Sequence, residues 1–214
     1  MRPSAAALYA AQRHQVLPLP RLRGPYQLKN AATALMALEL LDARFPVGRQ
    51  AVCAGLSSAE LPGRLQFMDE LGLRICDVAH NPQAAASLAE GLRHLPCTGQ
   101  THAVLAMLAD KDMAGVAAAM AETVTLWHVA GLDGERGTTA QQLAQQVRAV
   151  VPGSAVHEYA TVAAALAGAE LAAGPADRIV VFGSFHTVAA ALESCNDGEG
   201  RKSAPVQNER VSVR

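Results

Sequence analysis

Polar residues that can hold a nucleotide lie close together between Leu61 and Pro82. Arg64 follows a Pro-Gly pair, where a guanidinium can hold a phosphate through two parallel hydrogen bonds. Asp77 ends a short apolar segment, and its carboxylate can accept hydrogen bonds from both hydroxyls of a ribose. The stretch therefore predicts a ribose and phosphate site that includes His80. The alternative is a solvated turn residue at Arg64, a local cap at Asp77 and a satisfied loop histidine at His80.

The elements around these residues would place them where ligands bind. The apolar segment 73–78 predicts a buried strand, and Asn81 followed by Pro82 predicts the N-cap and first position of a helix through Leu95. Asp77 and His80 would then lie at the carboxyl end of a strand and face a helix N-terminus. Open α/β sheets bind ligands at such strand ends, and helix N-termini favour anions.

Apolar segments of strand length alternate with segments of helical period over the rest of the chain. Two helices, at 26–41 and 47–56, precede the Pro-Gly-Arg turn. Beyond it, strands are predicted at 101–108, 123–130, 154–159 and 178–182, each followed by a helix, and the last helix ends near Glu193. This order predicts an α/β fold with a mostly parallel, Rossmann-like sheet and helices on both faces.

Other polar residues lie at the ends of predicted elements. Asn30, near the start of the 26–41 helix, is either a cap or surface group or a ligand contact. Asp112 is predicted to cap a helix, although Lys111 beside it can reach a phosphate. Ser184 lacks the second glycine of a nucleophile elbow, so a nucleophilic role is disfavoured. Two interpretations of Ser184 and His186 remain: they belong either to a loop that binds a carboxylate or phosphate, or to a structural turn.

Composition indicates a globular protein without a general affinity for polyanions. The 214 residues are 50% hydrophobic and 17% charged, with a net charge of -1 and a pI of about 6.6. Neither nucleic-acid nor membrane binding is expected. The four cysteines form no Cys-x-x-Cys pair, so reduced thiols are expected rather than a zinc site or disulfides. No signal peptide or membrane span is recognisable, and a cytoplasmic location is expected.

Five motifs occur in an order that is more specific than any one of them. They are Tyr-Gln-Leu-Lys-Asn-Ala-Ala-Thr-Ala at 26–34, Leu-Pro-Gly-Arg-Leu-Gln at 61–66, Asp-Val-Ala-His-Asn-Pro at 77–82, Ala-Asp-Lys-Asp at 109–112 and Gly-Ser-Phe-His-Thr-Val-Ala at 183–189. Over residues 16–193 the chain resembles the carboxyl-terminal part of the bacterial bifunctional folylpolyglutamate synthase/dihydrofolate synthase family, within the Mur ligase superfamily.

This resemblance implies an ATP-dependent amide ligase of folate biosynthesis, monomeric at full length. Members phosphorylate the carboxylate of dihydropteroate or of a folate, and L-glutamate then attacks the acyl phosphate. Matched to the motifs, Asn30 would contact ATP near its base, Arg64 its phosphates and Asp77 its ribose, with His80 as a further candidate. Ser184 and His186 would lie near the glutamate. The resemblance assigns no catalytic residue here.

The sequence departs from the family by lacking a Gly-x-x-x-x-Gly-Lys-Ser/Thr phosphate loop. The resemblance implies that residues 1–45 are the end of a central ATPase domain and that 46–193 form the Mur ligase carboxyl-terminal domain. The polar composition of 194–214, with little apolar content, predicts a disordered tail. The Mg²⁺ ligands are expected in the absent part of the ATPase domain. The chain alone is therefore expected to be inactive.

Two alternatives to this function remain at the level of sequence. The chain can be a non-catalytic α/β module that binds a nucleotide or a partner protein, or a fragment of a cell-wall Mur-type ligase. An exposed apolar stripe on the 26–41 helix would indicate that a partner surface normally covers it.

Overall fold

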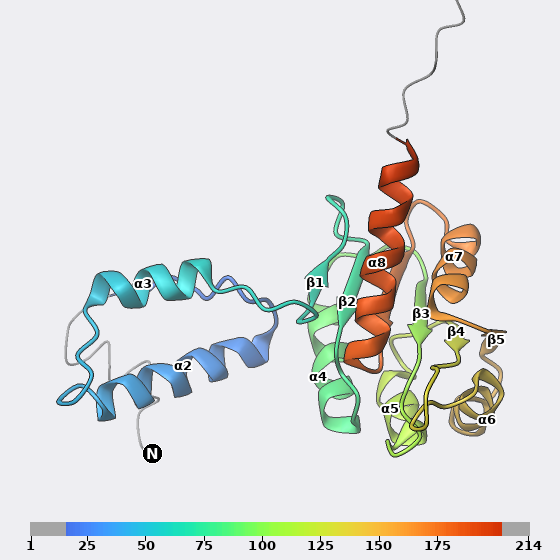
Figure 1. Ribbon diagram of the computed structural model, residues 1–214, viewed down its shortest axis with the longest axis horizontal. Helices are drawn as coiled ribbons and strands as arrows, with labels where there is room; N and C mark the ends of the chain where they lie inside the picture. The colour runs from blue at the N-terminus through green and yellow to red at the C-terminus, as the bar shows by residue number, and fades with distance from the viewer. Residues whose placement is uncertain (1–15, 203–214) are drawn as a thin grey trace, which may run out of the picture.

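A six-stranded sheet forms the centre of the computed structural model, which describes residues 16–202 and, from residue 196 on, the backbone only. Its strand order is β1-β2-β6-β3-β4-β5 (Figure 1). β1 pairs antiparallel with β2, and every other pair is parallel. The predicted α/β fold is confirmed. The strands are β1 (Gln66–Phe67), β2 (Arg74–Asp77), β3 (Thr101–Leu105), β4 (Leu126–Ala130), β5 (Ala155–Tyr159) and β6 (Arg178–Phe182).

Helices cover both faces of this sheet (Figure 1). One face packs against α4 (Pro82–Arg93), α5 (Met113–Met120) and α6 (Ala140–Val150). The other packs against α7 (Val162–Ala172) and α8 (Phe185–Lys202). The central strands β3 and β6 are buried along their whole length, as expected for parallel strands covered on both sides.

The predicted caps form, whereas some strand ends differ from the prediction. Asn81 accepts a hydrogen bond from Ala84 N at 2.9 Å, and Asp112 accepts one from Gly115 N at 2.8 Å. β3 ends at Leu105 and β4 begins only at Leu126. The apolar runs that suggested longer strands continue into loops, because burial and strand pairing do not end at the same residue.

The first two helices of the described residues form a separate pair. α2 (Pro25–Leu40) and α3 (Arg49–Ser58) lie side by side and project from the sheet (Figure 1). They share a small core around Leu35 and Val52. Val52 on α3 thus packs with Leu35 on α2. The sequence placed residues 46–193 in one domain, and that boundary stays a prediction. A local apolar period shows that a helix buries one face but not which core receives it.

The last helix differs from its predicted extent. α8 continues to Lys202 rather than ending near Glu193, so the predicted tail is helical over its first residues. Val188 and Ala191 anchor α8 on the sheet, and a helix that is already nucleated extends through polar residues at little cost. Residues 203–214 of that tail, like residues 1–15, lie outside the described residues.

Candidate functional site

A cavity of about 370 Å³ lies where α2 meets the carboxyl end of β2. Asn30, Arg64 and Asp77, which come from three separate segments, all line it. The remaining lining residues are Tyr26, Gln27, Leu61, Asn81, Gln83, Ala84 and Ser87. The three residues predicted to contact the base, phosphates and ribose thus share one cavity beside the N-terminus of α4.

Asp77 is the most buried charged residue of this cavity, with 4% of its surface exposed. Its Oδ1 accepts a hydrogen bond from Ala79 N at 2.8 Å, and its Oδ2 accepts one from Leu65 N, also at 2.8 Å. Burial raises the pKa of this carboxyl, and the two amides and the Arg64 charge oppose the rise. Since a carboxylate has about four acceptor positions, Asp77 can bind the local backbone and still accept from a ligand.

The turn that carries Arg64 is held from both sides. Gly63 has a φ of 71° and Leu65 a φ of 43°, both in the left-handed region. Gly63 O accepts from Val78 N at 2.8 Å, which ties the turn to the end of β2. Within residues 16–202 the guanidinium of Arg64 has no hydrogen bond or ion pair. A fixed backbone therefore presents a positive charge that is available to a ligand anion.

Asn30 lies one helical turn after a residue that the sequence analysis left without a role. Its Nδ2 donates to Oε1 of Gln27 at 2.9 Å, and Gln27 is only 5% exposed. This bond orients the Asn30 amide and leaves its oxygen free to accept. The i, i+3 spacing of the two amides on one predicted helix was the available sequence signal for Gln27.

His80 lies close to Asp77 in sequence but does not line the cavity. Its Nδ1 is 2.9 Å from Val78 O, and the ring is half-buried. This contact is the one expected of a satisfied loop histidine.

Ser184 and His186 lie at the start of α8, away from the cavity. Ser184 Oγ accepts from Thr187 N at 3.0 Å, and the Thr187 hydroxyl donates to Ala106 O at 2.7 Å. Ser184 is 5% exposed, whereas His186 is exposed. Ser184 thus makes the contacts of a helix cap, and the two side chains do not converge.

The acidic motif before α5 is an ion-pair cluster. Asp110 accepts from Arg136 at 2.8 Å and pairs with Lys111 at 3.0 Å. The Arg136 hydrogen bond, followed by that from Lys111, lowers the pKa of Asp110 to about 2. With Asp112 capping α5, the motif is accounted for by local contacts.

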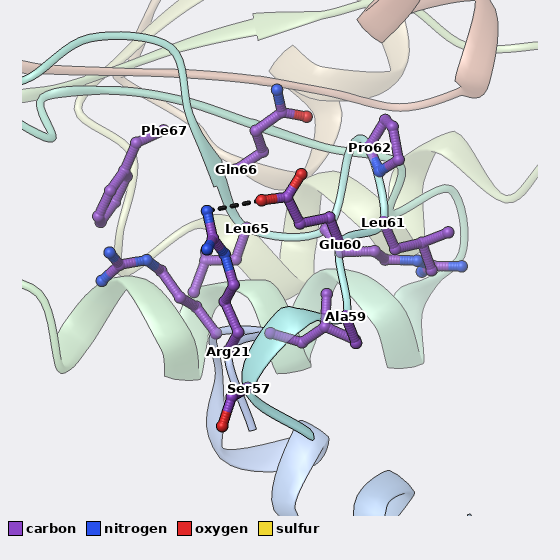
Figure 2. A pocket seen from close by; sticks show the side chains of 12 residues that line it. Arg21, Ser57, Ala59, Glu60, Leu61, Pro62, Leu65, Gln66 and Phe67 are labelled. Atoms are coloured by element: carbon purple, nitrogen blue, oxygen red, sulfur yellow. Dashed lines mark ion pairs between the residues drawn. The ribbon is translucent and has the colours of Figure 1, made fainter. Parts of the chain in front are cut away.

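A second cavity, of about 600 Å³, borders the connection between the helical pair and the sheet domain. Arg64 lines this cavity as well as the first. Arg21 and Glu60, which both line this cavity, form the ion pair drawn in Figure 2, with a nitrogen–oxygen distance of 2.6 Å. The Arg23 guanidinium lies 4.3 Å from the centre of the Phe67 ring. These contacts join the segment before α2 to the segment around β1.

The described residues form neither a cluster of metal ligands nor a membrane-spanning helix. No three or more His, Cys, Asp or Glu side chains of residues 16–202 are arranged to hold a metal ion. No helix in the same range has both the length and the apolarity needed to cross a bilayer.

Residues 63–185, more than half of the chain, match the family model for the Mur ligase glutamate ligase domain. The chain belongs to the Mur ligase family. This match begins at the Gly63 turn and ends at the start of α8, so it covers the sheet domain but not the helical pair.

Sequence similarity to individual members of the Mur ligase family also covers α2 and α3. The chain is 42% identical over 177 residues to the Escherichia coli dihydrofolate synthase/folylpolyglutamate synthase, which is 83% of this chain and 39% of that protein. It superimposes on E. coli FolC in complex with DHPP and ADP with a TM-score of 0.74 at 39% identity, covering 87% of this chain and 42% of that one.

A bifunctional folylpolyglutamate synthase/dihydrofolate synthase with Mn, AMPPNP and L-glutamate bound gives the same TM-score and identity, covering 84% and 41% of the two chains. This Mur ligase chain therefore spans about two fifths of the length of the relatives that it matches.

Proposed function

We propose that this chain forms the adenosine-binding side of an ATP-dependent ligase that joins L-glutamate to dihydropteroate or to a folate. The observation that carries the proposal is the convergence of Asn30, Arg64 and Asp77 on one cavity. The names of the relatives, and the ADP, AMPPNP and L-glutamate in the related structures, support the choice of substrates.

The proposed reaction has two steps. A carboxylate of the pteroate or folate attacks the γ-phosphorus of ATP, which forms an acyl phosphate and releases ADP. The amine of L-glutamate then attacks the acyl carbon, loses a proton and displaces phosphate, which leaves an amide. The L-glutamate bound in the related structure and the names of the relatives favour the folate branch over a cell-wall ligase.

The donors and acceptors in the cavity suit a nucleotide. Asp77 offers acceptor positions for ribose hydroxyls, and the Arg64 guanidinium is available to phosphates. The Asn30 amide, which donates one N–H to Gln27, keeps its oxygen and its second N–H for a base. In this proposal these residues bind and orient ATP. They do not transfer the phosphoryl group.

No three or more His, Cys, Asp or Glu side chains of residues 16–202 gather into a metal site. Phosphoryl transfer relies on a metal ion and a phosphate cradle to neutralise charge. We propose that the ligase activity needs a second domain that supplies the phosphate loop and the metal ligands, and that the 214 residues alone bind nucleotide without ligating glutamate.

The surface of α2 supports a partner domain. Leu28, Met36 and Leu40 are 51%, 39% and 80% exposed on this helix. An exposed apolar stripe of this kind is expected on a helix that a partner surface normally covers. It favours a domain of a larger ligase over a module that acts alone.

Nucleotide titration followed by NMR tests the binding half of the proposal. We expect Arg64→Ala to weaken ATP binding by about tenfold or more and to leave adenosine binding unchanged, because a charged hydrogen bond contributes about 1.5–3 kcal/mol. Asn30→Ala should weaken both ligands. Arg93→Ala, in the last turn of α4 and thus at its other end, is the matched control. Absence of ATP binding at millimolar concentration contradicts the proposal.

Complementation tests the ligase half. The part of the E. coli relative that this chain does not match is produced separately and mixed with the chain, ATP, Mg²⁺, dihydropteroate and L-glutamate. Formation of dihydrofolate in the mixture and in neither component alone is expected. Ligation by the chain alone contradicts the need for a second domain.

A further inference from the structure

The Tyr26 hydroxyl points at the carboxylate that is proposed to hold the ribose. Tyr26 OH lies 3.5 Å from Oδ2 of Asp77, although the two residues are 51 positions apart and belong to different parts of the molecule, α2 and β2. Tyr26 also lines the cavity shared by Asn30, Arg64 and Asp77. It is therefore placed to interact with whatever binds Asp77.

The acceptor positions of Asp77 show what this contact occupies. The amides of Leu65 and Ala79, both on buried backbone, take one position on each oxygen at 2.8 Å. About two of the four positions then remain, and the Tyr26 hydroxyl takes the one on Oδ2. A ribose diol that uses both oxygens needs that same position. At 3.5 Å the bond from Tyr26 is long and correspondingly easy to replace.

The backbone at the start of α2 leaves room for the Tyr26 ring. Gly24, the N-cap, has a φ of 105°, and a β-carbon there would lie 2.8 Å from Cε1 of Tyr26. The ring therefore occupies space that only glycine leaves open. Burial, followed by the Asp77 charge, raises the pKa of Tyr26 to about 12, so the hydroxyl keeps its proton at neutral pH and donates to the carboxylate.

We propose that the Tyr26 hydroxyl occupies, in the nucleotide-free protein, the acceptor position on Asp77 that a ribose needs. The ribose hydroxyls of a bound nucleotide then displace it. The inference rests on the proposed function, since it takes the ligand to be an adenine nucleotide. Tyr26 is on α2 and Asp77 is on β2. Replacement of the Tyr26 hydroxyl by a ribose hydroxyl would therefore remove one hydrogen bond between the helical pair and the sheet domain when a nucleotide enters the cavity.

The test compares Tyr26→Phe with the unaltered chain in titrations with ADP and with 2′,3′-dideoxy-ADP. Because the bond from Tyr26 is long, removal of this competing hydroxyl should tighten ADP binding by roughly two- to threefold, the equivalent of a weak hydrogen bond, and leave the dideoxy nucleotide unchanged. Tyr159→Phe removes a hydroxyl that bonds to His128 at 3.1 Å outside the cavity, and it should change neither affinity. Fluorescence of the single tryptophan, Trp127, verifies folding of the sheet domain in each variant, and helical circular dichroism verifies that of α2 and α3.

The other outcomes separate the two proposals. If ADP binds and Tyr26→Phe has no effect, weakens ADP binding, or changes both nucleotides equally, the displacement is wrong and the nucleotide site stands. If neither protein binds ADP, the proposed function itself fails, and the inference that rests on it fails with it.

Discussion

The Asp77 carboxylate accepts a 2.8 Å hydrogen bond from the backbone N–H of Leu65, a buried residue with a φ of 43°. The residue predicted to bind a ribose therefore also fixes the strained turn that carries Arg64. Left-handed backbone costs a non-glycine residue roughly 1–2 kcal/mol, and the buried side chain and this hydrogen bond offset that cost. Ligand binding and local folding thus depend on the same carboxylate.

Replacement of Asp77 by alanine should consequently destabilise the fold as well as the site. The amides of Leu65 and Ala79 would lose their acceptor in a buried environment, at a cost of roughly 2–4 kcal/mol in the free energy of unfolding. Urea denaturation followed by Trp127 fluorescence measures it. Asp69→Ala is the control, because Asp69 also accepts from two amides, of Leu73 and Arg74, but near the surface. Equal losses in the two variants contradict the role of burial.

The Gly63 turn gives a second test, based on backbone geometry. A β-carbon at Gly63 would lie 2.7 Å from Cγ1 of Val78 in addition to the strain of a φ of 71°. Gly63→Ala should cost about 2–4 kcal/mol, from left-handed strain and overpacking together. Gly153 has a φ of 87° and nothing within 4 Å of such a carbon, so Gly153→Ala should cost only about 1–2 kcal/mol. Thermal unfolding of both variants compares the two; a smaller cost at Gly63 contradicts the close approach.

The sequence marked Arg64 and Asp77 as candidates because Pro-Gly turns and strand ends have local signatures, and the structure places both on one cavity. Their roles in binding a ligand stay predictions. Tyr26 and Gln27 were missed, since their roles depend on contacts that form only when α2 packs beside β2. The packing of Val52 on α3 against Leu35 on α2 is a long-range contact of the same kind. Likewise, alternation predicted parallel strands, but the placement of β6 between β2 and β3 is a long-range property that no local pattern contains.

Acid should destabilise the chain through a buried histidine on β4. His128 is 1% exposed, lies 3.2 Å from His102 through ring nitrogens, and has no nearby carboxylate partner among its hydrogen bonds. Burial, followed by the charges of His102 and His157, lowers the pKa of His128 from 6.5 to about 4. The unfolded chain therefore binds the proton first, and stability that is full above pH 6.5 is lost as the pH falls towards 4.

Urea midpoints between pH 7.5 and 4.5 measure this loss, which should approach about 1.4 kcal/mol per pH unit for this group. His128→Phe should flatten the dependence even though it lowers the stability at neutral pH by removing a partner of the Tyr159 hydroxyl. His157→Gln changes an exposed histidine and should keep most of the slope. An unchanged slope in His128→Phe contradicts the assignment.

The small core of the helical pair predicts that α2 and α3 unfold apart from the sheet domain. Leu35 and Val52 are the buried residues of this core, and Leu35→Ala should cost the pair roughly 2–5 kcal/mol. A core of this size has little stability to lose, so we expect reduced helical circular dichroism and loss of ADP binding through Asn30. The Trp127 transition should not move, because Trp127 lies in the sheet core.

Leu143→Ala, a substitution in that same sheet core, is the control and should shift the Trp127 transition. If Leu35→Ala shifts the Trp127 midpoint as far as Leu143→Ala does, the helical pair and the sheet domain unfold as one cooperative unit. The contact between Tyr26 and Asp77 then lies inside one rigid body, and nucleotide binding does not change how the two parts sit.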